Sequence, residues 1–115
     1  MSEFEKQVEQ IAADTRELTE ILQKAQQKDS RGECTDDLLR EAESLANVIG
    51  AEILDVCLVH IVKNIEVTNA SIAPIAAAFM AAGRLLLNSA DEEIRDYVEQ
   101  FCDNTVDKLL DIAEG

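Results

Sequence analysis

The sequence predicts an all-α protein, a four-helix up-and-down bundle in which an Ala-rich third helix is buried. Ala, Leu, Glu and Ile are abundant, whereas the chain has one Pro and only four Gly, so few turns are available. Between Val67 and Gly83 there is no Asp, Glu, Lys or Arg. Because a helix that is apolar on all sides belongs in a core, we expect this segment to be the most buried. The length of 115 residues favours a single domain, 1–115.

The first helix is predicted from Ser2 to about Lys28. Ser2 and Glu5 have the S-x-x-E spacing of a capping box, in which both residues satisfy free backbone N–H groups at a helix start. Along this segment, apolar or small residues recur at alternating steps of three and four: Phe4, Val8, Ile11, Thr15, Leu18, Leu22 and Ala25. This heptad seam is narrow, so the helix either packs at the periphery or pairs with a second copy of itself. We therefore expect a homodimer.

The second helix is predicted to follow a short loop. Gly32 stands where a residue that ends a helix is expected, and Thr35 or Asp36 can cap the next helix. This second helix runs to about Asn64. Its second half, from Ile53 onward, is apolar on most faces and should lie deeper than its first half.

The third helix is predicted to follow an N-cap residue at Asn69 or Ser71 and to run to about Asn88. Pro74 lies in its first turn, where a missing N–H group costs little. Small side chains recur every four residues and would let another helix approach closely, at Ala73, Ala77 and Ala81.

The fourth helix is predicted from a second S-x-x-E box, Ser89 and Glu92, to about Ala113. Residues 91–114 contain nine acids and two bases, a net charge of −7, which is half of the chain's −14. Five of the acids share one helix face because they are spaced by three or four residues: Asp96, Glu99, Asp103, Asp107 and Asp111. Such a face is suited to a basic protein partner, whose charge would relieve the mutual repulsion.

The net charge of −14 bears on the choice of partner, since an acidic surface repels nucleic-acid phosphates and anionic lipid. We expect neither nucleic-acid nor membrane binding. The N-terminal residues lack the basic and apolar regions of a signal peptide, which favours a cytoplasmic location. The composition thus indicates a small acidic, protein-binding helical bundle with a regulatory, inhibitory or adaptor role, without catalysis and without a cofactor.

His60, the only histidine, offers a first alternative. With Lys63 it forms an H-x-x-K pattern that resembles the histidine-phosphotransfer domains of two-component signalling, which are acidic four-helix bundles. The resemblance implies that His60 accepts a phosphoryl group and that Lys63 assists it. The chain departs from that family at Asn64, where a Gly normally follows the Lys.

Glu52 and Asp55 offer a second alternative. Their E-x-x-D spacing resembles one element of the all-α, Mg²⁺-dependent nucleotide pyrophosphatases of the MazG type. Carboxylates at i and i+3 share a helix face and are suitable ligands for a hard cation. The resemblance requires a second acidic pair, for which Glu17 and Glu20 have the spacing, although they lie on the outer face of the first helix.

Overall fold

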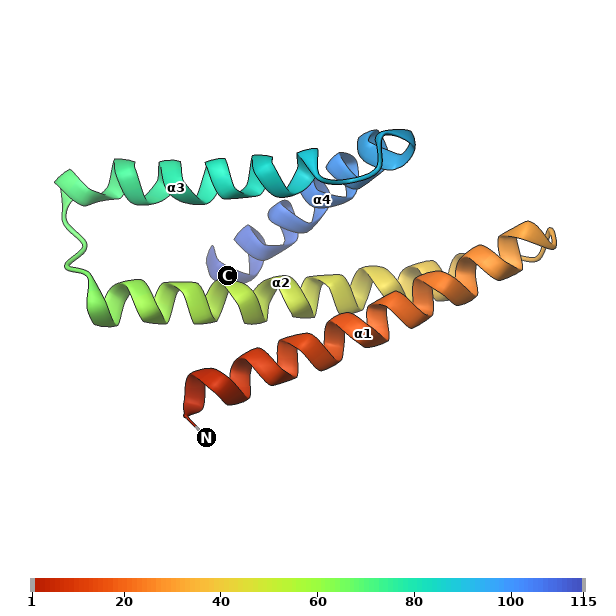
Figure 1. Cartoon of the computed structure of the whole chain (residues 1–115), viewed down its shortest axis with the longest axis horizontal. Coiled ribbons are helices and arrows are strands. Elements are labelled where there is room, and N and C mark those ends of the chain that lie inside the picture. The colour runs from red at the N-terminus through yellow and green to blue at the C-terminus, as the bar shows by residue number, and fades with distance from the viewer. Residues whose placement is uncertain (1, 115) are drawn as a thin grey trace. The chain divides into compact units, whose positions relative to one another are not determined.

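The computed structural model describes residues 2–114 and is all-helical, as predicted, with no strand in that range. Its helices are α1 (Glu3–Ser30), α2 (Asp36–Asn64), α3 (Asn69–Asn88) and α4 (Arg95–Glu114), and a short 3₁₀ turn, η1 (Glu92–Ile94), precedes α4 (Figure 1). The chain divides after Cys57 into two compact units. The division falls within the continuous helix α2, and each unit is described by itself.

The first unit is an antiparallel hairpin of α1 and the part of α2 up to Cys57 (Figure 1). At the start of α1, the backbone N–H of Glu5 donates to Ser2 Oγ at 3.1 Å, as the predicted cap requires. At its end, Gly32 has φ +74°, a left-handed conformation that a residue without Cβ adopts at little cost. The N–H groups of Gly32 and Glu33 donate to the carbonyls of Asp29 and Lys28, which completes a Schellman motif.

The core of this first unit is formed by five small or branched apolar residues. Ala42 is only 1% exposed and is the most buried of the five. Of the seven residues of the predicted α1 seam only Ala25 is buried, and Phe4, Val8 and Leu22 are exposed. The buried residues are Ile21 and Ala25 of α1 and Ala42, Ile49 and Val56 of α2.

The second unit contains the last turns of α2, then α3, η1 and α4. The helix α3 begins one residue earlier than predicted, because Thr68 is its N-cap residue. Ser71 does not cap the helix from outside. It lies inside the first turn, where its Oγ accepts the backbone N–H of Thr68 at 2.8 Å.

The predicted capping box at Ser89 and Glu92 is wrong. Ser89 Oγ donates backward to the carbonyl of Leu86 at 2.6 Å, so Ser89 closes α3 instead of opening the next helix. A serine hydroxyl bonds to nearby backbone groups on either side, so the spacing alone did not decide between the two ends. The following residues form η1, and α4 begins at Arg95.

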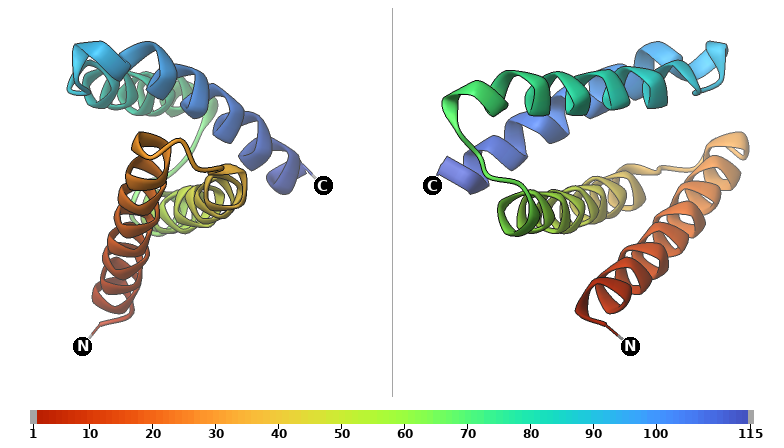
Figure 2. Two further views of the ribbon diagram at one scale, coloured as in Figure 1. Left: turned by 90° about the vertical axis from the view of Figure 1, so that its right-hand side faces the viewer. Right: turned by 60° about the vertical axis from the view of Figure 1, so that its left-hand side comes forward.

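The Ala-rich helix α3 has no buried residue, and neither has α4. The two helices meet at the turn that joins them and diverge away from it (Figure 2). The large apolar side chains of α3 consequently stay exposed, among them Ile72, Phe79 and Leu86. Burial of α3, like the up-and-down arrangement, remains a prediction for the assembled protein.

By length and composition alone, α2 and α3 are two helices of the described chain that could cross a membrane. A core helix of a soluble protein meets the same criterion. The exposed apolar surface of α3 therefore needs a covering that the single chain does not supply within this unit.

Candidate functional sites

The acidic face of α4 is the most extensive charged feature of the second unit. Its members lie at steps of three and four residues along a regular helix, so their carboxylates form one stripe, which we call the acidic stripe. Four of the five are exposed: Asp96, Asp103, Asp107 and Asp111.

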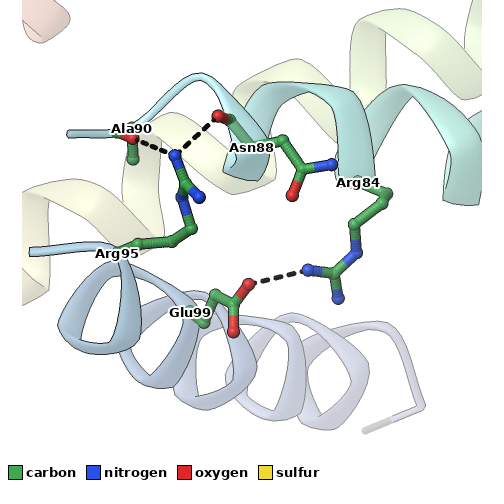
Figure 3. Close-up of polar contacts among 5 residues, drawn as sticks. All are labelled: Arg84, Asn88, Ala90, Arg95 and Glu99. Atoms are coloured by element: carbon green, nitrogen blue, oxygen red, sulfur yellow. Dashed lines mark hydrogen bonds and ion pairs between the residues drawn. The ribbon is translucent and has the colours of Figure 1, made fainter. Parts of the chain in front are cut away.

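The fifth member, Glu99, already has a partner. Its Oε1 accepts a hydrogen bond from Arg84 Nη1 of α3 at 2.7 Å, and the residue is half-buried (Figure 3). Arg84 is the one ionisable residue of α3, so this ion pair neutralises the charge within an otherwise uncharged helix. Glu99 therefore joins α4 to α3, and the other four carboxylates are exposed.

Arg95 fixes the start of α4. Its Nη2 donates to the carbonyls of Asn88 at 3.0 Å and Ala90 at 2.9 Å (Figure 3). These carbonyls lie at or just beyond the end of α3, where helical partners are missing. Arg84 and Arg95 together anchor the N-terminal half of the acidic stripe, so that the stripe starts from a defined position.

The residues of the phosphotransfer alternative, His60 and Lys63, are both exposed in the last turns of α2. The side-chain amide of Asn64 donates to the backbone carbonyl of His60 at 2.9 Å, which satisfies a carbonyl at the helix end. Asn64, which stands where that family has a Gly, thus acts locally on the helix terminus.

The residues of the pyrophosphatase alternative line a cavity in the first unit. Glu52 and Asp55 of α2 share it with Glu3, Lys6 and Gln10 of α1. Asp55 is exposed, whereas Glu52 is half-buried and its Oε1 is fully buried without a hydrogen-bond partner.

Asp14 of α1 lies beside Glu52 and raises the pKa of the Glu52 carboxyl. The largest cause is hydrogen bonding with the Asp14 side chain, followed by desolvation on burial and by repulsion from the Asp14 charge. Gln10 Nε2 donates to Asp14 Oδ1 at 3.0 Å and orients that carboxylate. Two acidic side chains, one from each helix of the hairpin, therefore lie close together here.

Asp14 was missed in the sequence, although a signal for it exists. Ile11 of α1 and Val56 of α2 line the same cavity. They therefore lie opposite each other in the antiparallel hairpin, and each step forward along α1 corresponds to a step backward along α2. In that register Glu52 lies opposite residue 14 or 15, next to the seam member Thr15. Predicting the pair required the register of the hairpin, which the helical pattern does not contain.

The predicted metal site does not assemble in the described chain. Within residues 2–114, no three His, Cys, Asp or Glu side chains are grouped so as to hold a metal ion. Glu17 and Glu20, the pair with the expected spacing, are exposed and do not line the cavity of Glu52. The carboxylates present do not fit the ligand set that the resemblance implies, so no step through a metal ion follows.

Comparisons with protein-family models, with curated proteins and with solved structures found no match.

Proposed function

We propose that this chain is a small acidic, cytoplasmic, protein-binding module that acts as a homodimer and has a regulatory, inhibitory or adaptor role without catalysis. Its partner is a protein with a Lys- or Arg-rich surface, which docks on the acidic stripe of α4. We further propose that the helices assemble into an up-and-down bundle that buries α3.

One observation carries the docking proposal: Asp96, Asp103, Asp107 and Asp111 are exposed on one face of a single helix. Like charges at these spacings repel by a few tenths of a kcal/mol per pair, so the stripe slightly destabilises the isolated helix. A basic surface would remove that repulsion on binding and would be drawn in by the field of the stripe.

The experiment compares partner capture by the parent chain with capture by the triple variant Asp96→Asn, Asp103→Asn, Asp107→Asn. Immobilised protein is incubated with native lysate, and the bound proteins are identified and quantified by mass spectrometry. We expect a basic protein whose capture falls at least tenfold with the variant. Capture should also fall between about 0.1 M and 1 M salt, as the Debye length shortens from about 10 Å to about 3 Å.

A matched control distinguishes the effect of the acidic stripe on binding from the effect of the overall net charge. The variant Glu9→Gln, Glu17→Gln, Glu20→Gln removes three exposed acids from α1 and changes the net charge by the same amount. We expect it to retain capture. Equal loss with both triple variants would assign binding to overall charge, and indifference to salt and to both variants would contradict the proposal.

The exposure of His60 and Lys63 favours phosphotransfer as a second candidate. It is tested by incubating the chain with acetyl phosphate and separating the products on a phosphate-affinity gel. A stoichiometric, acid-labile phosphate that is lost in the His60→Gln variant would support phosphotransfer and displace the binding-module proposal. The binding-module proposal expects no such product and normal partner capture by this variant.

A further inference from the structure

The ion pair of Arg84 with Glu99 belongs to the acidic stripe as well as to the contact between α3 and α4. Arg84 Nη1 donates to Glu99 Oε1 at 2.7 Å, although the two residues are 15 positions apart in the sequence (Figure 3). This is the distance of a close charge-assisted hydrogen bond. By contrast, Arg40 and Asp37 of α2 form a looser ion pair of 3.9 Å within one helical turn. A guanidinium from another helix is therefore bound on the stripe itself.

Arg84 has the chemistry of the proposed partner. A Lys- or Arg-rich surface would offer the acidic stripe the same kind of group that Arg84 offers Glu99. Glu99 lies between Asp96 and Asp103 along the stripe. A basic surface that follows the stripe therefore has to take the place of Arg84 at Glu99, and the two cations compete for one carboxylate.

The ion pair lies at the surface of the second unit, where it can be exchanged. The Arg84 side chain is 59% exposed and that of Glu99 is 35% exposed. Breaking a pair that water reaches leaves no buried charge without a partner, so it costs less than breaking a buried pair. Arg84 can therefore turn to solvent when a partner's cation replaces it.

Arg95 holds the start of α4 in place independently of this ion pair. Its Nη2 donates to the backbone carbonyls of Asn88 and Ala90 in the turn that joins α3 to α4 (Figure 3). These bonds do not involve Glu99. An exchange of cations at Glu99 therefore changes the charge that the stripe presents and leaves the anchor of its helix intact.

The balance of charge favours a separate protein over the chain's own first unit at this surface. Residues 1–57 contain 14 acids and six bases, a net charge of −8. The first unit as a whole therefore repels the acidic stripe, whereas a basic protein is attracted by the same field.

We propose that Arg84 is autoinhibitory: its guanidinium occupies Glu99 and competes with the basic partner for the acidic stripe. This inference rests on the proposed function and describes how the same surface is regulated. A weakly basic protein leaves Arg84 in place and meets only the other four carboxylates, whereas a strongly basic one displaces it. Arg84 thereby raises the density of positive charge that a partner needs for tight binding.

The test measures the affinity for one defined probe, a fluorescein-labelled deca-arginine peptide, by fluorescence anisotropy at about 0.1 M salt. The full chain is compared with Arg84→Gln, which removes the competing cation. Arg16→Gln is the matched control, because Arg16 is an exposed arginine of α1 and its replacement changes the net charge equally. Circular dichroism checks that each variant keeps its helix content.

We expect Arg84→Gln to bind the peptide about two- to fivefold more tightly than Arg16→Gln does, the range that a partly exposed ion pair allows. The gain should depend on Glu99, so in the Glu99→Gln background it should fall below about twofold. This double-mutant cycle distinguishes competition at Glu99 from a general change in charge. A variant Arg84→Gln that binds no more tightly than Arg16→Gln, or a gain that persists without Glu99, would overturn the inference.

The same assay judges the docking proposal separately, through the triple variant Asp96→Asn, Asp103→Asn, Asp107→Asn. Weaker peptide binding by this variant, with no gain in Arg84→Gln, would leave docking on the stripe standing and remove only the autoinhibitory role of Arg84. Peptide binding that the triple variant does not weaken would contradict both proposals.

Discussion

Arg84 Nη1 of α3 and Glu99 Oε1 of α4 lie 2.7 Å apart, and this ion pair joins two helices that otherwise bury none of their residues. The pair neutralises the cation of α3 and removes one carboxylate from the acidic stripe. What remains exposed in the second unit is an uncharged surface on α3 and an acidic surface on α4.

We expect Glu99→Gln to lower the stability of the chain by about 0.5 kcal/mol, because partly exposed ion pairs contribute between about 0 and 1 kcal/mol. Thermal unfolding by circular dichroism at low and high salt measures this loss, which should shrink as salt screens the parent pair. Asp103→Asn on the same helix is the control. It relieves repulsion without breaking a contact and should be neutral or slightly stabilising. Equal losses in both variants would contradict a specific role for Glu99.

Replacing Ala42 by Leu should cost about 1–3 kcal/mol, because Ala42 is 1% exposed and a larger side chain would overpack the hairpin of the first unit. Ala77→Leu on α3 is the comparison, since Ala77 is exposed within the second unit and would be overpacked only if the proposed bundle buries α3. Denaturant unfolding measures both changes. A greater loss for Ala77→Leu would show that the Ala stripe of α3, and not the hairpin, is the tightest helix contact.

Helix content could be predicted from the sequence because it depends on local spacing. The ends of α1 and α2, the cap at Ser2 and the left-handed Gly32 follow from side chains within a few residues of one another. The failure at Ser89 has the same local origin, since its hydroxyl had two nearby backbone groups to choose between.

Contacts between residues of different helices could not be predicted from the helical periodicity of the sequence. The contact of Asp14 with Glu52 depends on the register of the hairpin, and the pairing of Arg84 with Glu99 depends on how α4 returns along α3. The acidic stripe could be predicted in outline because its members lie on one helix. The ion pair of Glu99 with Arg84 of α3 could not be predicted in this way.

Replacing Gly32 and Gly83 by Ala should change the stability of the chain in opposite directions. Gly32 has φ +74°, so Gly32→Ala should cost about 1–2 kcal/mol, the cost of a left-handed conformation for a residue with Cβ. Gly83 lies within α3, and a Cβ added there meets no atom within 4 Å. Gly83→Ala should therefore raise stability by about 0.5–1 kcal/mol through helix propensity. Thermal unfolding under dilute conditions compares the two, and changes of the same sign would contradict this account of both positions.

The carboxyl pair of Asp14 and Glu52 predicts a pH-dependent stability. The pKa of Glu52 is raised in the folded chain, so the folded state holds this proton more tightly than the unfolded state does. The resulting stabilisation is fully present below the unfolded pKa of Glu52 and is lost as pH rises through the raised folded value. The charge of Asp14 and the half-buried setting both oppose ionisation of Glu52.

Glu52→Gln should therefore raise the melting temperature at pH 7, because the amide donates permanently to the Asp14 carboxylate and removes one charge. The gain over the parent should shrink as pH is lowered, since Glu52 of the parent then takes up a proton and loses its charge. Glu3, Lys6 and Asp55 also line the adjoining cavity, so the control is Asp55→Asn, which removes an exposed carboxylate from the same helix. Melting curves of the three proteins between pH 4 and pH 8 make the comparison. A gain for Glu52→Gln that is constant over this range, or matched by Asp55→Asn, would contradict a pKa of Glu52 that Asp14 raises.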